Sequence, residues 1–185
     1  MKPKLLLHVC CATCGAYVLD LLKNNYEVTA YYYNPNIYPL EEYEKRFLEI
    51  QKYCQINKIP FVEEKPDQDA WFAKIKGFEQ EPERGKRCWL CYEMRLAKTA
   101  EYAKNHSFEV FGTDLSISPH KDAKKLNEIG KHLAKLYSLK YLEADFKKRD
   151  GFKKAMAISR QNDFYRQDYC GCIYSLQNSR KNKAI

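Results

Sequence analysis

Residues 4–15 read KLLLHVCCATCG and contain the clearest indication of the architecture of this chain. The first half of this segment is a short apolar run rich in branched residues, which predicts a buried β-strand over residues 4–9. Residues 15–24 that follow have the pattern of a helix. The cysteines therefore occupy the loop of a strand-loop-helix unit.

Further strands and helices alternate along the chain. Strands are predicted over 27–33, 59–63, 108–115 and 140–144. Helices are predicted over 40–54, 88–105 and 122–136, with a short helix and a loop within 66–87. This alternation is typical of a parallel sheet with helices on both faces, so we expect a single-domain α/β fold. The expected domain spans residues 1–178, followed by a basic C-terminal tail over 179–185.

The order of elements also predicts where a ligand would bind. Parallel α/β sheets bind ligands beyond the carboxyl ends of their strands, at the point where strand order reverses. The first strand ends at Val9, and its outgoing loop is CCATCG, residues 10–15. We expect the site at this loop.

Composition and charge narrow the function classes. The formal net charge of +8 favours polyanionic partners but does not identify one, and the scattered basic residues also fit solvated helix faces. No stretch approaches the roughly 20 apolar residues that span a bilayer, and the short N-terminal run is interpreted as a strand, so we expect a cytoplasmic protein without a membrane partner. No glycine-rich phosphate-binding motif occurs in the sequence. Nothing in it therefore supports nucleotide-dependent phosphoryl transfer or hydride transfer.

Cysteines are the most informative residues. The chain has eight, and seven of them fall in tight groups at 10–14, 88–91 and 170–172. Because structural disulfides are rare in reducing compartments, clustered cysteines there indicate metal or redox chemistry. The eighth, Cys54, lies on the apolar face of a predicted helix and is interpreted as core.

Two of the groups have the spacing of metal half-sites. Cys88 and Cys91 form a CxxC pair that opens a helix, where free N–H groups and the helix dipole favour thiolates. Cys10 and Cys11 can serve one site only if the strand has already ended, because successive side chains in a strand alternate faces. A four-thiolate set suits zinc or an iron-sulfur cluster. The CCxxC spacing is not that of a zinc ribbon, yet zinc stays an alternative.

The third group, Cys170-Gly171-Cys172, is a CxC pair. A disulfide across one intervening residue closes a small, strained ring that is easily reduced, which suits redox cycling. The alternative is that both cysteines are further metal ligands.

Four motifs occur in order along the chain: HVCCA at 8–12, YNPNI at 33–37, CWLCYEMR at 88–95 and YRQDYCGCIYS at 165–175. Together they resemble the QueH-type epoxyqueuosine reductases, from the first strand almost to the carboxyl end. The resemblance implies an adenine nucleotide alpha hydrolase-like (HUP) fold. It also implies reductive deoxygenation of epoxyqueuosine to queuosine, at the anticodon wobble position of tRNA.

The resemblance assigns site residues by position. The implied ligands of a 4Fe-4S cluster are Cys10, Cys11, Cys88 and Cys91. The implied redox-active disulfide joins Cys170 and Cys172. Cys14 stands where family members vary between cysteine and aspartate, and is the expected ligand of a second, mononuclear iron.

These parts suggest a mechanism. Conversion of an epoxide to an alkene needs two electrons and two protons, and a dithiol stores such a pair, whereas one cluster passes electrons singly. We expect an iron to act as a Lewis acid on the epoxide oxygen, with electrons from an unidentified donor arriving through the cluster. Asp114, at the end of the predicted fourth strand, is a candidate proton donor; the alternative is a structural carboxylate that caps the next turn. Candidate contacts to tRNA phosphates are Arg95, Arg166 and Lys121.

Two other functions compete with this hypothesis. One is a metal-free thiol-disulfide oxidoreductase that uses the CxC pair alone, which leaves five clustered cysteines unexplained. The other is a zinc-stabilised basic module that binds RNA without changing it. Metal analysis after anaerobic purification separates the three.

Overall fold

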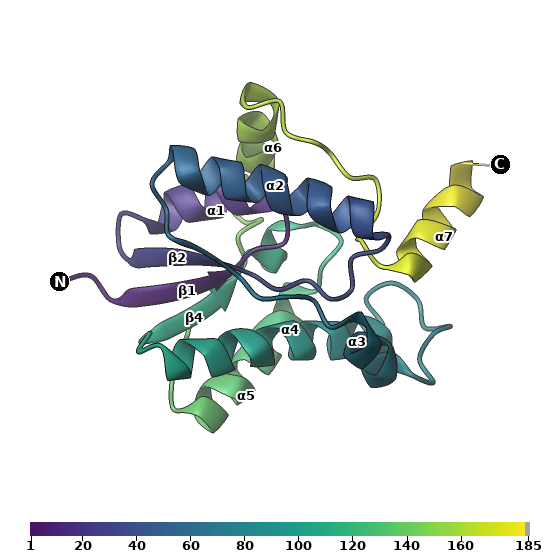
Figure 1. The fold of residues 1–185 in the computed structure, drawn as a ribbon, viewed down its shortest axis with the longest axis horizontal. Helices are drawn as coiled ribbons and strands as arrows, with labels where there is room; N and C mark the ends of the chain where they lie inside the picture. The colour runs from purple at the N-terminus through teal and green to yellow at the C-terminus, as the bar shows by residue number, and fades with distance from the viewer. Residues whose placement is uncertain (184–185) are drawn as a thin grey trace.

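The computed structural model describes the backbone of residues 1–183 and the side chains of residues 1–180. Its helices and strands alternate as predicted (Figure 1). In chain order they are β1 Lys4–His8, α1 Ala12–Leu22, β2 Glu27–Tyr32, α2 Leu40–Ile56, β3 Phe61–Glu63, α3 Gln68–Ile75, α4 Lys86–Asn105, β4 Val110–Thr113, the 3₁₀ turn η1 Asp114–Ile117, α5 Ala123–Tyr137, β5 Lys140–Tyr141, α6 Gly151–Gln161 and α7 Ile173–Lys183.

The strands form one parallel sheet of five, in the order β3-β2-β1-β4-β5. β1 is central, and Leu6 pairs with Thr29 of β2 on one side and Phe111 of β4 on the other. The chain builds the sheet outward in one direction after β1 and in the other direction from β4. The strand order therefore reverses beside β1, so the loop after β1 lies where the sequence predicts a ligand site.

Helices cover both faces of the sheet, as Figure 1 shows: α1, α2 and α6 on one face, and α4 and α5 on the other, with α3 packed against α4. The consecutive leucines of β1 explain this arrangement. Leu5 and Leu7 belong to the apolar core under α1 and α2, whereas Leu6 belongs to the core under α4 and α5. All three are fully buried, as expected for a strand covered on both sides. The predicted α/β fold is confirmed.

Several segments differ from the expectation or go beyond it. α1 begins at Ala12 and not at Gly15, so Cys14 lies in the helix and not in the preceding loop, and the predicted strand 140–144 ends at Tyr141. The predicted strand 108–115 ends at Thr113, because the Thr113 hydroxyl accepts a hydrogen bond from the Leu115 N–H (3.1 Å) and turns the chain into η1. Residues after 144 carry α6 and α7, which the sequence pattern did not reveal. α7 crosses the predicted domain boundary at 178; residues 184–185 of the predicted tail lie outside the described residues. Within the described chain, no helix is long and apolar enough to cross a membrane.

Candidate functional site

The loop after β1 turns two adjacent cysteines toward one place. β1 ends at His8, and the Val9 N–H still bonds to Tyr31 O of β2 (2.9 Å), but Cys10 has left the sheet. Cys11 immediately precedes α1 with an extended backbone. Because the strand has ended, the two cysteines do not alternate faces, and their sulfurs lie 3.7 Å apart.

Cys14, in the first turn of α1, completes a triad with Cys10 and Cys11. The three sulfurs lie within 4.8 Å of one another, close enough to hold one metal ion. In the part of the chain that the structure describes, no other three cysteine, histidine or carboxylate side chains come so close. Hydrogen bonds from Cys10 and Cys14 lower the pKa of the Cys11 thiol well below its usual value, and Gln167 Nε2 donates to the same sulfur (3.1 Å).

Asp114 holds the loop after β1 through a hydrogen bond to its backbone. Its Oδ2 accepts a hydrogen bond from the Cys10 N–H (3.1 Å), and the side chain is fully buried. Burial, and then the charge of Cys11, raise the pKa of Asp114 to about 8. Its Oδ1 has no hydrogen-bond partner among the described residues.

A polar chain connects the loop to α4. Asn34, in the segment after β2, donates from Nδ2 to Val9 O (3.0 Å) and accepts at Oδ1 from Arg95 Nη1 of α4 (2.9 Å). The Arg95 guanidinium is buried, and its charge is close enough to the sulfurs of Cys91 and Cys10 to interact with both. The two predicted half-sites, one at Cys10 and one at Cys91, therefore lie around the Arg95 guanidinium.

Cys88 and Cys91 occupy the first turns of α4, as predicted. Gly85 caps this helix, and the Arg84 N–H donates to Cys88 Sγ (3.3 Å). Both cysteines are buried and line a small cavity together with Cys170 and Cys172. The structure thus brings the CxxC and CxC pairs to the same place.

Several buried polar groups in the walls of this small cavity have no hydrogen-bond partner among the described residues. Five such groups occur in the described chain: the donors Trp71 Nε1, Arg87 Nε, Tyr92 OH and Arg95 Nε, and the acceptor Asn36 Oδ1. Buried donors are nearly always paired, and an unpaired one costs roughly 1–3 kcal/mol. A set of orphaned donors beside thiols therefore fits an anionic group with several acceptor atoms.

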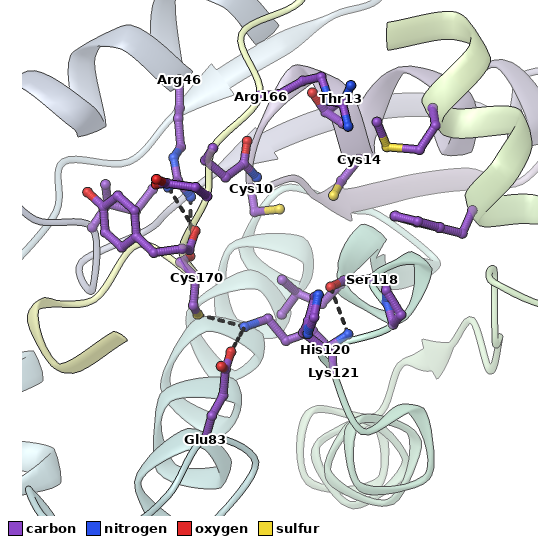
Figure 2. Close-up of a pocket in the computed structure, with 18 of the residues that line it drawn as sticks. Cys10, Thr13, Cys14, Arg46, Glu83, Ser118, His120, Lys121, Arg166 and Cys170 are labelled. Carbon is purple, nitrogen blue, oxygen red and sulfur yellow. Dashed lines mark hydrogen bonds and ion pairs between the residues drawn. The ribbon is translucent and has the colours of Figure 1, made fainter. Parts of the chain in front are cut away.

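A larger cavity of about 330 Å³ opens on the other side of the CxC pair. Figure 2 shows Cys10 entering it from the β1 loop, Cys14 from the first turn of α1, Cys170 from the C-terminal segment, and Lys121 from the loop before α5. Arg166 lies at the same cavity and is exposed. Arg95, Lys121 and Cys170 line both cavities, so they form the wall between them.

Arg46 holds the CxC segment in place. The side chain is 2 % exposed; its Nη1 donates to Cys170 O (3.2 Å) and its Nη2 to Tyr169 O (3.3 Å). Glu42, one turn earlier on α2, balances its charge at 2.6 Å. Cys170 and Cys172 are both free thiols in this structure.

Sequence reasoning assigned no role to several residues of this site. Asn34 and Gln167 lie inside the quoted motifs, so the resemblance marked them without giving their contacts. Arg46 and Glu42 carried no signal, because an acid and a base four residues apart on a helix usually form an exposed pair. Arg95 and Lys121, candidate phosphate contacts, are buried and face the cysteines.

Comparisons with known proteins agree on one family. The sequence model of the family described as epoxyqueuosine reductase QueH matches residues 5–178. Epoxyqueuosine reductase QueH of Haemophilus influenzae is 44% identical over 180 residues, which cover 96% of this chain and 74% of that protein. The QueH of Streptococcus pyogenes is 38% identical over 181 residues, which cover 95% of this chain and 71% of that protein.

Among solved structures, the fold is similar to the U34-tRNA thiolase NcsA from Methanococcus maripaludis with its 4Fe-4S cluster. The TM-score is 0.56 at 14% identity, over 100% of this chain and 67% of that one. At this identity the likeness shows the fold alone, which is of the HUP type that the sequence motifs imply. The match to nearly the whole chain, together with identities of 44% and 38%, shows that the chain belongs to the QueH family of epoxyqueuosine reductases.

Proposed function

We propose that this chain removes the epoxide oxygen of epoxyqueuosine in tRNA and leaves queuosine. One observation carries the proposal: three cysteine groups that are far apart in the sequence lie together at the carboxyl ends of the strands, around two adjoining cavities. The family match over residues 5–178 includes all of them. The substrate is proposed to enter the larger cavity as the modified base at the wobble position.

The proposed cofactor is a 4Fe-4S cluster on Cys10, Cys11, Cys88 and Cys91. The donor chemistry of the described residues fits such a group. A cluster with four thiolates is an anion, and N–H groups near its sulfurs tune its potential. The orphaned donors beside Cys88 and Cys91, and the buried Arg95 between the half-sites, supply hydrogen bonds and positive charge of that kind.

A second, mononuclear iron on Cys14 is also part of the proposal. Cys14 and Cys10 both line the larger cavity, and Cys14 is the member of the triad outside the proposed cluster set. When bound, the iron centres supply single electrons and a Lewis acid for the epoxide oxygen.

The CxC pair is proposed to store the two electrons of the reaction. When the Cys170 and Cys172 thiols close to a disulfide, they release two electrons and two protons. These balance the reaction, because an epoxide with two electrons and two protons gives an alkene and water. Cys170 lines the cavity proposed for the substrate, which supports this role.

Asp114 is proposed as the acid that protonates the departing oxygen. Support comes from its position: one carboxylate oxygen binds the Cys10 N–H, and the other is unpartnered among the described residues. The predicted alternative was a carboxylate that caps the next turn, but Thr113 caps η1, and the structural contact of Asp114 is the one to the β1 loop.

The proposed partners are tRNA that contains epoxyqueuosine and an electron donor whose kind is not assigned. The net charge of +8 and the exposed Arg166 at the cavity support the tRNA partner. A cytoplasmic location is part of the proposal, because a reducing compartment keeps the seven clustered thiols available.

The test uses anaerobically purified holoprotein. We expect iron and acid-labile sulfide in the protein, and queuosine in the mass spectrum of digested tRNA after incubation with epoxyqueuosine-containing tRNA and dithionite. Cys170→Ser or Cys172→Ser should keep the iron and abolish turnover, whereas Cys54→Ala, which removes a core cysteine outside the site, should keep both. Zinc without iron would favour the RNA-binding module, and neither metal would favour the metal-free oxidoreductase.

A further inference from the structure

The two cysteines of the CxC pair lie in opposite environments. Cys172 is 6 % exposed and packs in an apolar cluster with Trp71 and Ile75. Cys170 is half-buried and lines the cavity open to solvent. A reagent or substrate in that cavity therefore meets Cys170 first.

A buried lysine contacts only the cavity-facing member. Lys121 is 8 % exposed, and its Nζ lies 2.6 Å from Cys170 Sγ (Figure 2). Its nearest carboxylate, Glu83, is 3.9 Å away and 41 % exposed, so the thiol is the closer partner of the ammonium group. An ammonium ion that is removed from water requires a negative partner, and a thiolate supplies one.

The local sequence fixes the direction of Lys121. A turn brings the Lys121 N–H to Ser118 O (3.2 Å). The next residue, Asp122, caps α5 by accepting the Lys125 N–H at 3.1 Å. Lys147 Nζ also donates to Lys121 O (3.3 Å). The backbone is therefore held on both sides, and the side chain enters the cavity wall.

The partner segment is equally constrained. Arg46 binds the carbonyls of Tyr169 and Cys170, and the Tyr38 N–H donates to Gly171 O (2.8 Å). Gly171 has φ +120°, a conformation that residues with a Cβ rarely adopt. This turn places the Cys170 thiol beside Lys121 and the Cys172 thiol at the apolar cluster.

We propose that Lys121 is a positioning residue that makes Cys170, and not Cys172, the reactive thiolate of the pair. This inference rests on the proposed function and deepens it by giving the two cysteines different roles. The hydrogen bond from Cys172 and the Lys121 ammonium hold the pKa of Cys170 well below its usual value, in agreement with the 2.6 Å contact between Lys121 Nζ and Cys170 Sγ.

The roles follow for reduction of the disulfide by an external dithiol. One thiolate of the dithiol attacks Cys170 Sγ; the S–S bond to Cys172 breaks, and the Cys172 sulfur leaves with the electron pair and takes a proton. The second thiol of the reductant then attacks its own sulfur in the mixed disulfide. Cys170 leaves as a thiolate beside Lys121, and the reductant becomes a disulfide. The pair has gained two electrons and one proton, which is on Cys172, and the other proton of the dithiol has gone to water.

The test measures alkylation of the reduced holoenzyme by iodoacetamide under anaerobic conditions, resolved by residue with mass spectrometry. Cys170 should react at least about tenfold faster than Cys172, because the thiolate is the nucleophile. Lys121→Met should slow Cys170 on the order of tenfold, and Lys121→Arg should restore much of the rate. Lys125→Met is the matched control, since Lys125 Nζ pairs with Glu128 (3.0 Å) and should leave the rate unchanged.

Two results would overturn the inference. One is Cys172 reacting as fast as Cys170 in the unsubstituted enzyme, a comparison that does not depend on the folding of any variant. The other is a Lys121→Met enzyme with the parent's iron content and an unchanged Cys170 rate. Turnover of epoxyqueuosine-containing tRNA by the same unsubstituted sample is a separate readout. Turnover without Cys170 selectivity refutes this inference alone, and selectivity without turnover refutes the proposed function.

Discussion

Replacement of Arg46 by methionine should destabilise the protein strongly. The Arg46–Glu42 pair is buried on both sides, at 2 % and 9 % exposure, with a separation of 2.6 Å. Removal of one partner from a buried pair costs about 3–5 kcal/mol, because the other charge stays buried without compensation. In addition, the carbonyls of Tyr169 and Cys170 lose the donors that fix the CxC segment.

The effect is measurable as a melting temperature. For a domain of this length, 1 kcal/mol corresponds to about 2–4 °C, so Arg46→Met should lower the melting temperature by on the order of 10 °C. Circular dichroism under anaerobic conditions, on samples matched for iron content, provides the measurement. Glu42→Gln combined with Arg46→Met should recover part of the loss, because no unpaired charge remains.

An exposed pair of similar geometry provides the control. Lys23 and Asp20 are 2.7 Å apart, with side chains 50% and 34% exposed. Lys23→Met should cost less than about 1 kcal/mol, since water screens such pairs. If Arg46→Met melted within 2–3 °C of the parent, or if the double substitution were no better than the single one, buried-charge compensation would not explain this contact.

Three further predictions concern the site. Cys91→Ser should lose iron, acid-labile sulfide and visible absorption, and parent-level iron and sulfide would show that the proposed ligand set is wrong. Asp114→Asn keeps an acceptor for the Cys10 N–H but removes the carboxylic acid; turnover should fall by about 10²–10⁴ with iron content unchanged, and parent-level turnover would leave only the structural role. Gly171→Ala should cost about 1–3 kcal/mol in a thermal melt, because a Cβ at φ +120° would also approach Arg46 Nη1 at 3.1 Å. Gly77→Ala, at φ +85° with nothing within 4 Å, isolates the backbone contribution, and an equal loss there would contradict the role of the contact.

The sequence predicted the parts of the fold that depend on local pattern. Leu5, Leu6 and Leu7 indicated a strand buried on both faces, and the cysteines after it indicated a loop at the point where strand order reverses. Both depend on side-chain alternation and chain order, which are visible in one dimension.

The contacts that organise the site were not predictable in the same way. Lys121 meets Cys170 across 49 positions, and Arg46 meets it across 124. Neither has a local pattern that distinguishes it from an exposed cation. The unpaired Trp71 and Tyr92 groups likewise become informative only when burial shows that no acceptor among the described residues reaches them.

The position of the CxC pair after the strands of the sheet has a consequence for biosynthesis. The described sheet is complete at Tyr141, and the cysteines of the first two groups precede it, whereas Cys170, which forms part of the wall between the cavities, follows it. On the ribosome, a nascent chain therefore presents the proposed cluster ligands before residues 170–172 are synthesised. Until then the wall that Cys170 contributes is absent, and the proposed cluster ligands are more open to solvent than in the folded protein.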